Sequence, residues 1–236
     1  MAIRSSLLRR TKEALVNLTN PRTGGLLLMA AAPTLLAAEL VRSDHSQERY
    51  AAQLADVSAH RTPELLSATL FVAGGILLVL AAIGLASAVR EGRGRMLVQL
   101  GAASLGIGGL WMAAGRAMFE VIAYALAATD TAASAASLDQ IGNSAATAIF
   151  IPLLLALVAG PILLTIGLGR AGLASPWLGA VWFAGLIVFL GTETSKLGNL
   201  VGFGAMMAVL AVVGFAIRAS RVDRRAAALQ PLRSGA

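Results

Sequence analysis

Cysteine is absent from the 236 residues, and histidine occurs only twice. Without cysteine the chain has no disulfide, thiolate metal site, iron–sulfur cluster or cysteine nucleophile. Both histidines, His45 and His60, fall outside the apolar stretches, which excludes a haem held between two histidines inside a membrane. We therefore expect no cofactor and no metal site.

Charge is also scarce. Charged residues make up 13% of the chain and hydrophobic residues 57%, whereas a water-soluble domain carries about 25% charge. The mean hydropathy is +0.77 and the isoelectric point is near 11.2. So apolar a chain belongs in a lipid bilayer. A strongly basic balance also occurs in nucleic-acid-binding proteins, but here the cations flank the apolar stretches, so we expect no nucleic-acid partner.

Six continuous apolar stretches predict membrane-spanning helices, each of which needs about 20 apolar residues. The runs lack the alternation of barrel strands. The predicted fold class is therefore all-α, a polytopic membrane bundle of six transmembrane helices. No repeat relates the first three stretches to the last three, so an inverted-repeat transporter is not expected. The six stretches are Gly24–Val41, Leu65–Val89, Met96–Ala128, Ala145–Gly169, Trp177–Thr192 and Leu200–Ile217.

Basic residues indicate the orientation, because they concentrate on the cytoplasmic side. With a cytoplasmic N-terminus, the inner segments hold 14 basic residues against three acids, and the outer segments hold four against seven. Both termini are thus predicted to be cytoplasmic, with anionic lipids at the basic inner face. The predicted regions are 1–22, a basic segment that is either an amphipathic surface helix or disordered, 23–218, the bundle with its outer loop 42–64, and 219–236, a basic tail.

The two longer outer segments carry different predictions. Residues 46–59 are rich in helix formers and lack glycine and proline, which predicts a surface helix that ends before Pro63. Residues 129–144 consist mainly of alanine, serine, threonine and aspartate. That composition predicts either a mobile loop or a small cap over the bundle.

Two motifs resemble a known group of proteins. The first begins with Arg22-Thr-Gly-Gly-Leu-Leu-Leu and closes with Glu39-Leu-Val-Arg42, and the second runs from Gly167 through Pro176 to Gly179. Both are similar to a broad group of small six-span bacterial membrane proteins that contain a domain of unknown function. The resemblance implies six helices and a bacterial cytoplasmic (inner) membrane, and it implies no activity.

Ionisable residues within the predicted spans are the candidate site. Arg116 and Glu120 are four residues apart in the third span, hence on one helical face where they can pair. The same face carries Gly101, Leu105, Gly108 and Met112, whose small residues suit close helix contact, so it should point into the bundle. Glu39 and Glu193 are expected at a similar depth on the outer side, with Trp111 as a wall. We predict an outward-facing polar cavity, while the alternative is a purely structural ion pair.

Prolines and glycines add further candidates. Pro33 and Pro161 lie near the middles of spans one and four, where a proline bends a helix. The spacings Gly106–Gly109 and Gly198–Gly202 predict close packing, either within the chain or between protomers. Asp56 and His60 would share a helical face, but a zinc site with His45 would require the loop to fold back. We expect a solvated loop instead.

Three functions remain open. The first is a non-enzymatic protein that binds or transports a small molecule or lipid through the polar cavity. The second is a structural or regulatory subunit that docks a membrane protein partner or a second copy. The third, an intramembrane enzyme, has the least support because no hydrolase, nucleotide-binding or metalloprotease motif is present, and we name no catalytic residue. A cavity around Arg116 and Glu120 favours the first function, and a tightly packed, mutually satisfied pair favours the second.

Overall fold

A computed structural model of the chain describes residues 17–42, 50–128, 131–142, 148, 150–192 and 195–229. These residues are almost all helical and include no strand, which confirms the predicted all-α fold. Five helical segments are long and apolar enough to cross a membrane, and a sixth, of 15 residues, is shorter. The helices are α2 (Pro21–Val41), α3 (Tyr50–Ala59), α4 (Arg61–Leu85), α5 (Arg95–Leu110), η1 (Trp111–Arg116), α6 (Ala117–Leu126), α7 (Thr131–Gly142), α8 (Ile151–Arg170), α9 (Trp177–Gly191) and α10 (Lys196–Leu229).

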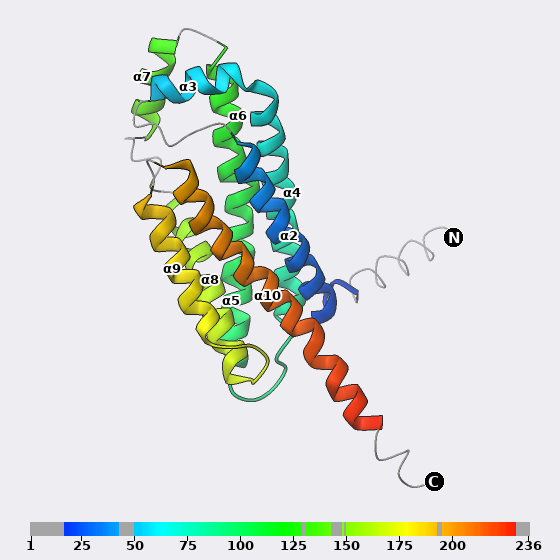
Figure 1. Ribbon diagram of the computed structural model, residues 1–236. Coiled ribbons are helices and arrows are strands. Elements are labelled where there is room, and N and C mark those ends of the chain that lie inside the picture. Colours follow the sequence, from blue (N-terminus) through cyan, green and yellow to red (C-terminus); the bar gives the residue numbers. More distant parts are fainter. Residues whose placement is uncertain are drawn as a thin grey trace, which may run out of the picture.

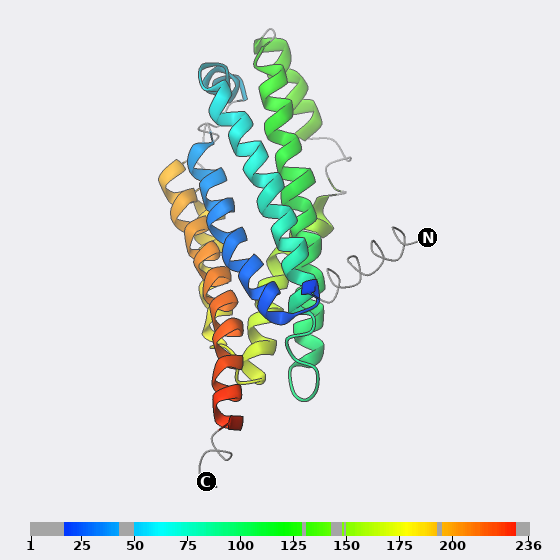
Figure 2. The same ribbon diagram turned by 90° about the vertical axis from the view of Figure 1, so that its right-hand side faces the viewer.

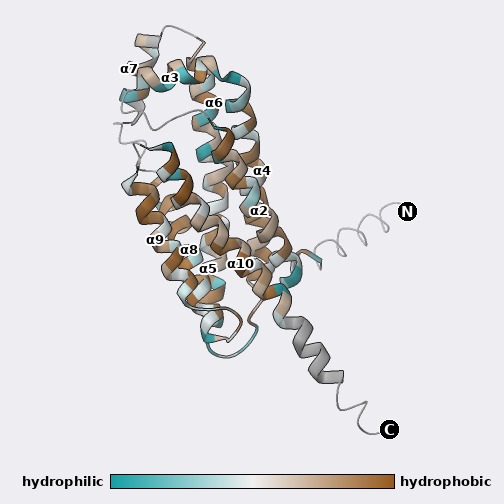
Figure 3. Cartoon of the chain, viewed as in Figure 1, coloured by the Kyte–Doolittle hydropathy of each residue, from teal (hydrophilic) through white to brown (hydrophobic). Residues whose placement is uncertain are grey.

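The long helices lie side by side and form a bundle (Figures 1 and 2). Helices α3 and α7 lie at one end, which we name the cap end (Figure 1). The loop 86–94 between α4 and α5 and the connection 171–176 between α8 and α9 lie at the opposite end, named the basic end. The C-terminal part of α10 extends beyond the bundle there. Hydrophobic residues follow the length of the bundle, while hydrophilic residues gather at both ends (Figure 3).

The third apolar stretch is one rod made of α5, η1 and α6. Its middle segment, Trp111–Arg116, is a π-helix, a feature that occurs mostly as single turns and frequently at functional sites. Within this turn the indole of Trp111 covers Gly115 so closely that a Cβ atom at 115 would overlap the ring. Glycine at position 115 therefore leaves room for the indole of Trp111 against the π-turn. The π-turn ends at Arg116.

Glycines allow the helices to approach each other closely inside the bundle. A Cβ atom at Gly84 of α4 would lie 2.7 Å from the Cα of Gly24 on α2, and one at Gly109 of α5 would lie 2.8 Å from the carbonyl oxygen of Gly75 on α4. A Cβ atom at Gly185 of α9 would lie 2.9 Å from the carbonyl oxygen of Gly202 on α10. The glycine spacings predicted as packing surfaces are thus used within one chain.

The helix boundaries differ from the predicted ones most clearly in the first outer segment. The stretch 42–64 is not a simple loop, because it contains α3 and the first residues of α4. Arg42 caps the C-terminus of α2, and Glu64 lies fully buried in the first turn of α4. The predicted surface helix exists as α3, which ends before Pro63.

The cap end has a small hydrophobic core of its own. Leu54 and Val57 of α3 pack there with Ala123 of α6 and Leu138 of α7, and all four side chains are buried. The second outer segment therefore supplies a helical cap, as one of its two predicted alternatives stated. This cap lies next to the upper part of α6 (Figure 1), where it covers the polar residues described below.

Candidate functional site

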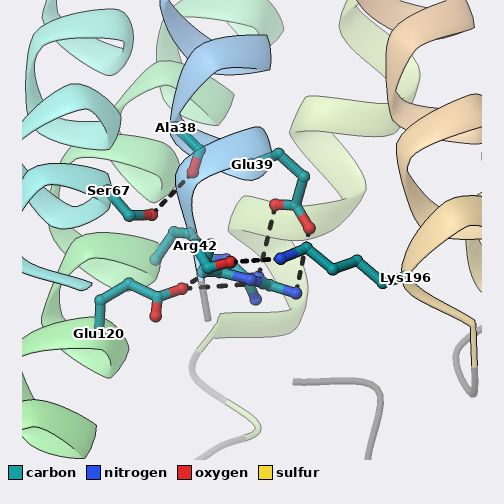
Figure 4. A network of polar contacts seen from close by, with 7 residues as sticks. Ala38, Glu39, Arg42, Ser67, Glu120 and Lys196 are labelled. Carbon is teal, nitrogen blue, oxygen red and sulfur yellow. Dashed lines mark hydrogen bonds and ion pairs between the residues drawn. The ribbon is translucent and has the colours of Figure 1, made fainter. Parts of the chain in front are cut away.

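Four charged side chains near the cap end form a closed ring, which we name the charge ring: Glu39, Arg42, Arg116 and Glu120. The two arginines alternate with the two glutamates. Arg42 contacts Glu39 at 3.0 Å and Glu120 at 3.7 Å, while Arg116 contacts Glu39 at 3.8 Å and Glu120 at 3.3 Å. Each charge thus faces two opposite charges, and the ring has no net charge. Figure 4 shows three of these side chains converging from α2 and α6.

Burial makes this pairing necessary. The side chains of Glu39, Arg42 and Glu120 are at most 8% exposed. A buried ion costs several kcal/mol unless an opposite charge and hydrogen bonds compensate it. The ring supplies such compensation from two sides: the end of α2, and the rod in which η1 ends and α6 begins.

Neighbouring polar groups tie the ring to the rest of the bundle. Lys196, the first residue of α10, donates a hydrogen bond from Nζ to the carbonyl oxygen of Arg42 at 2.8 Å. The buried Ser67 of α4 donates to the carbonyl oxygen of Ala38 at 2.9 Å. Both contacts appear in Figure 4. The carbonyl of Arg42 follows the last turn of α2, where carbonyl groups lack an intrahelical donor, whereas the carbonyl of Ala38 also accepts the backbone N–H of Arg42 at 3.2 Å.

Arg116 differs from the other three members of the ring. Its side chain is 29% exposed, although its guanidinium also lies over the ring of the buried Phe71, 5.5 Å from the centroid. A guanidinium carries five N–H donors, and the two ion pairs of Arg116 involve only Nε and Nη2. Arg116 is therefore the ring member best placed to meet a further group.

A polar cavity of about 330 Å³ lies on the cap side of the ring. Three ring members line it together with the polar side chains of α3 and α10. Its wall also includes residues of the cap core, so the cavity lies between the ring and the cap. The lining residues are Arg42, Tyr50, Gln53, Leu54, Arg116, Phe119, Glu120, Ala123, Leu138, Phe189 and Asn199.

A second, apolar cavity of about 230 Å³ lies deeper in the bundle. Its walls are aliphatic, aromatic and methionine side chains of α4, η1, α8, α9 and α10, and its only charged lining residues are Glu39 and Arg116. Ligand sites in proteins combine such apolar walls with a few well-placed polar groups. The lining residues are Glu39, Phe71, Trp111, Met112, Arg116, Leu154, Leu157, Val158, Trp182, Leu186, Phe189, Leu190, Phe203, Met206 and Met207.

Each cavity is lined by a residue with a buried polar atom that lacks a hydrogen-bond partner among the described residues. In the polar cavity this residue is Asn199, through Oδ1, and in the apolar cavity it is Trp182, through Nε1. Trp182 is only 2% exposed. A buried group without a partner costs about 1–3 kcal/mol, so a bound molecule that supplies a donor to Asn199 Oδ1 or an acceptor to Trp182 Nε1 would recover that energy.

The structure brings together three of the four charged residues proposed from the sequence. Arg116 and Glu120 pair as their spacing predicts, and Glu39 joins them from α2. The fourth, Glu193, lies outside the described residues. Trp111, predicted as a wall of the polar cavity, lines the apolar cavity instead.

The two prolines have different surroundings. Pro33 lies exposed within α2 and lines neither cavity. Pro161 lies buried within α8, one turn beyond Leu157. Because proline has no N–H, it cannot hydrogen-bond to the carbonyl four residues earlier, which here belongs to a residue lining the apolar cavity.

Arg42 is the member of the charge ring that was not predicted from the sequence. It was assigned to the outer loop because it follows the last apolar residue of the first span. Its partner lies three residues earlier, at Glu39, a spacing that places both on one face of a helix. That spacing was the available signal, since α2 ends at Val41 as predicted and Arg42 is its C-cap residue.

Metal-binding groups do not gather in the described part of the chain. No three histidine, aspartate or glutamate side chains lie close enough there to hold a metal ion. Asp56 and His60 do share a face as predicted, with Oδ1 and Nδ1 3.1 Å apart. His45, which a zinc site would have required and for which a solvated loop is predicted instead, lies outside the described residues.

Comparison with known proteins gives no family for this chain: no family model, curated protein or solved structure matches it. The charge ring and its two cavities must therefore be interpreted from their own chemistry.

Proposed function

We propose that the protein binds a single-chain amphiphile with an anionic head, such as a fatty acid, and that it is not an enzyme. The head would occupy the polar cavity and the chain the apolar cavity. The observation that carries this proposal is the position of Arg116, which lines both cavities. A charged donor between a polar and an apolar chamber matches the point where an amphiphile changes from head to tail.

Cationic donors in the polar cavity support an anionic head, although the charges of the ring itself are balanced. Arg42 and Arg116 line it against one acid, Glu120, and Lys196 lies beside Arg42. Arginine binds carboxylate and phosphate groups through paired N–H donors. The remaining wall combines apolar side chains with neutral polar ones, among them Asn199 and Gln53.

The apolar cavity supports a chain that carries at least one hydrogen-bond acceptor. Phe189, which lines both cavities, and Trp182 are seven residues apart on α9, about 10 Å along the helix. An oxygen on the ligand at that depth, in a keto or ester group, would accept a hydrogen bond from the indole of Trp182. A lone water would find too few polar partners in such a chamber.

The proposal also includes a location and a topology. We infer that six helices cross the bacterial cytoplasmic membrane and that both termini are cytoplasmic. The arginine distribution supports the orientation, and the resemblance to small six-span bacterial membrane proteins supports the compartment. The helical rise along the axis is about 32 Å from Arg95 to Arg116 and about 27 Å from Pro21 to Glu39. Both values are close to the 30 Å thickness of a hydrocarbon core, so the ring would lie at its outer boundary.

Tryptophan quenching by a brominated fatty acid tests the proposal directly. A variant with Trp111→Phe and Trp177→Phe leaves Trp182 as the single tryptophan, inside the apolar cavity. Titration with palmitic acid brominated near the chain end should quench this fluorescence in a saturable way. Adding Arg116→Gln should weaken binding about 10- to 100-fold, because a hydrogen bond to a charged group contributes about 1.5–3 kcal/mol.

Arg61→Gln is the matched control for this experiment. Arg61 belongs to the same end of the bundle, where it stacks on Tyr124 at 4.4 Å and lines neither cavity. It should leave the titration unchanged. Quenching that rises in proportion to the fatty acid without saturation, or that is equal in the two arginine variants, would contradict the proposal. Native mass spectrometry of gently extracted protein would then identify the natural amphiphile by its mass.

A structural or regulatory subunit is the second candidate. It is favoured by the completeness of the charge ring, in which every charge already has two partners without any ligand. Under this hypothesis the ring only holds α2, η1 and α6 together. Arg116→Gln would then lower the stability of the bundle as much as Arg42→Gln does, and Trp182 would show no saturable quenching in any variant.

A further inference from the structure

A third pocket lies at the basic end of the bundle, far from the charge ring. It encloses about 560 Å³ between the loop 86–94 and the end of α8. We name it the basic pocket, since three of its eight lining residues are arginines. They are Ala88, Val89, Arg90, Glu91, Arg93, Arg170, Ala171 and Leu173.

The charges of this pocket are unbalanced, in contrast to those of the ring. Arg90, Arg93 and Arg170 are exposed, and none of them forms an ion pair within the described residues. The single acid in the lining, Glu91, is exposed as well. The pocket thus presents two uncompensated positive charges and several unused guanidinium donors.

The backbone of the loop is fixed against α8. Gly94 has a positive φ of 94°, and a Cβ atom there would overlap the carbonyl oxygen of Gly167. The N–H of Val98 donates to the carbonyl oxygen of Gly94 at 2.9 Å, which starts α5 from this contact. Arg93 and Arg170 therefore line the same pocket although they are 77 positions apart in the sequence.

Two large, exposed apolar residues lie a few positions in sequence after residues that line the pocket. Trp177, the first residue of α9, is 77% exposed, and Met96, at the start of α5, is 72% exposed. Exposed tryptophan is typical of the boundary between a membrane and water. The pocket therefore combines what a lipid headgroup site needs: cations, the apolar lining residues Val89 and Leu173, and, with the proposed membrane crossing, a position at the membrane surface.

We propose that the basic pocket binds the headgroup of an anionic phospholipid through its phosphate oxygens, with a preference for a headgroup that carries two phosphates. Arginine forms paired hydrogen bonds to phosphate, and basic pockets between membrane helices hold such headgroups. Two net positive charges match two phosphates better than one. The inference rests on the proposed membrane crossing and is independent of the amphiphile at the charge ring.

Lipid titration followed by native mass spectrometry of the full-length chain tests this site. The probes are cardiolipin with two phosphates, phosphatidylglycerol with one, and zwitterionic phosphatidylcholine. We expect cardiolipin to bind most tightly and phosphatidylcholine to show no specific binding. The double variant Arg93→Gln with Arg170→Gln should lower cardiolipin affinity about tenfold, and Arg90→Gln alone should lower it less.

Arg218→Gln is the matched control, because Arg218 is an exposed arginine of α10 that does not line the pocket. It should leave cardiolipin affinity unchanged. An equal loss in the control and the double variant would overturn the proposal in favour of non-specific attraction. Complete displacement of bound lipid by millimolar pyrophosphate would also overturn it, because the ligand would then be a soluble phosphate. Because all the substituted arginines are exposed, we expect every variant to fold. Size-exclusion chromatography checks this.

Discussion

Arg42 is the residue on which the charge ring depends most. Its side chain contacts both carboxylates, and its carbonyl oxygen accepts the hydrogen bond from Lys196. It also caps α2. Arg116 makes the same number of ion pairs, but its side chain is considerably more exposed, so water can take over part of its role.

We therefore expect Arg42→Gln to destabilise the protein more than Arg116→Gln does. Removal of one partner from a buried ion pair costs about 3–5 kcal/mol, because the remaining charge stays buried without compensation. For Arg116 we expect about 1–3 kcal/mol, the cost of a lost hydrogen-bond partner. The measurement is the temperature at which half of the protein has left the monodisperse peak in size-exclusion chromatography.

The difference in thermal stability between Arg42→Gln and Arg116→Gln decides between the candidate functions. A folded Arg116→Gln protein that has lost its amphiphile supports a binding site. If Arg116→Gln instead unfolds at the same low temperature as Arg42→Gln, then the two arginines serve stability equally and the case for a ligand at Arg116 is lost.

The pairing of Arg116 with Glu120 was predictable because both residues lie on one helix, where spacing alone defines the face. The meeting of Glu39 with Arg116 depends on how two helices pack, and no local pattern encodes it. Glu64 illustrates a missed local signal. Pro63 and Glu64 sit at the first turn of α4, where proline and acidic residues are favoured, but the hydropathy pattern places the helix start after them.

Close helix contacts in this protein depend on glycine pairs, and α2 with α4 is the clearest example. Gly24 and Gly84 face each other at a distance that leaves no room for a methyl group on either. The contact brings the two helices together at the basic end, while Ser67 joins them near the cap end. A larger residue at either glycine must separate the helices.

Gly84→Ala should accordingly destabilise the protein by about 1–3 kcal/mol, the usual cost of overpacking. Gly204→Ala on α10 is the control, since its Cβ atom would meet only Leu36 at an ordinary 3.9 Å. There alanine should stabilise the helix by about 0.5–1 kcal/mol. Thermal stability in the same chromatographic assay should shift in opposite directions, and a Gly84→Ala protein as stable as the parent would contradict the packing.

Element lengths could be predicted where hydropathy alone determines them, and less well elsewhere. The third stretch is continuous from Arg95 to Leu126, close to its prediction. Its π-turn was not predictable, because the residues Trp111–Arg116 suit an ordinary α-helix equally well. Helix α9 has 15 residues, about 22 Å. In Figure 1 the end of α9 and the start of α10 lie below the cap, and Phe189 of α9 and Asn199 of α10 line the polar cavity.

The chain as a whole has charged groups at two levels, separated by apolar helices. One level is the balanced charge ring, and the other is the unbalanced set of arginines at the basic end. The separation estimated along the helices is close to one hydrocarbon thickness. Balanced charges suit a buried site within the bundle, whereas unbalanced positive charges suit the cytoplasmic surface with its anionic lipids.

The arrangement of the two levels was largely predictable from the distribution of arginine. What the sequence did not indicate is that loop 86–94 and connection 171–176 meet in one pocket, or that the ring separates two cavities. Those features arise from contacts between helices that are distant in sequence, such as Gly94 against Gly167.

Single-cysteine labelling tests this architecture, and the natural absence of cysteine makes it simple. Ala55→Cys lies on an exposed position of α3 at the cap end, and Arg93→Cys lies exposed at the basic end. In sealed cells a membrane-impermeant maleimide should label Ala55→Cys at once and Arg93→Cys only after the membrane is permeabilised. Equal labelling of both variants in sealed cells, or of neither, would place the two ends on one side of the bilayer and contradict the account.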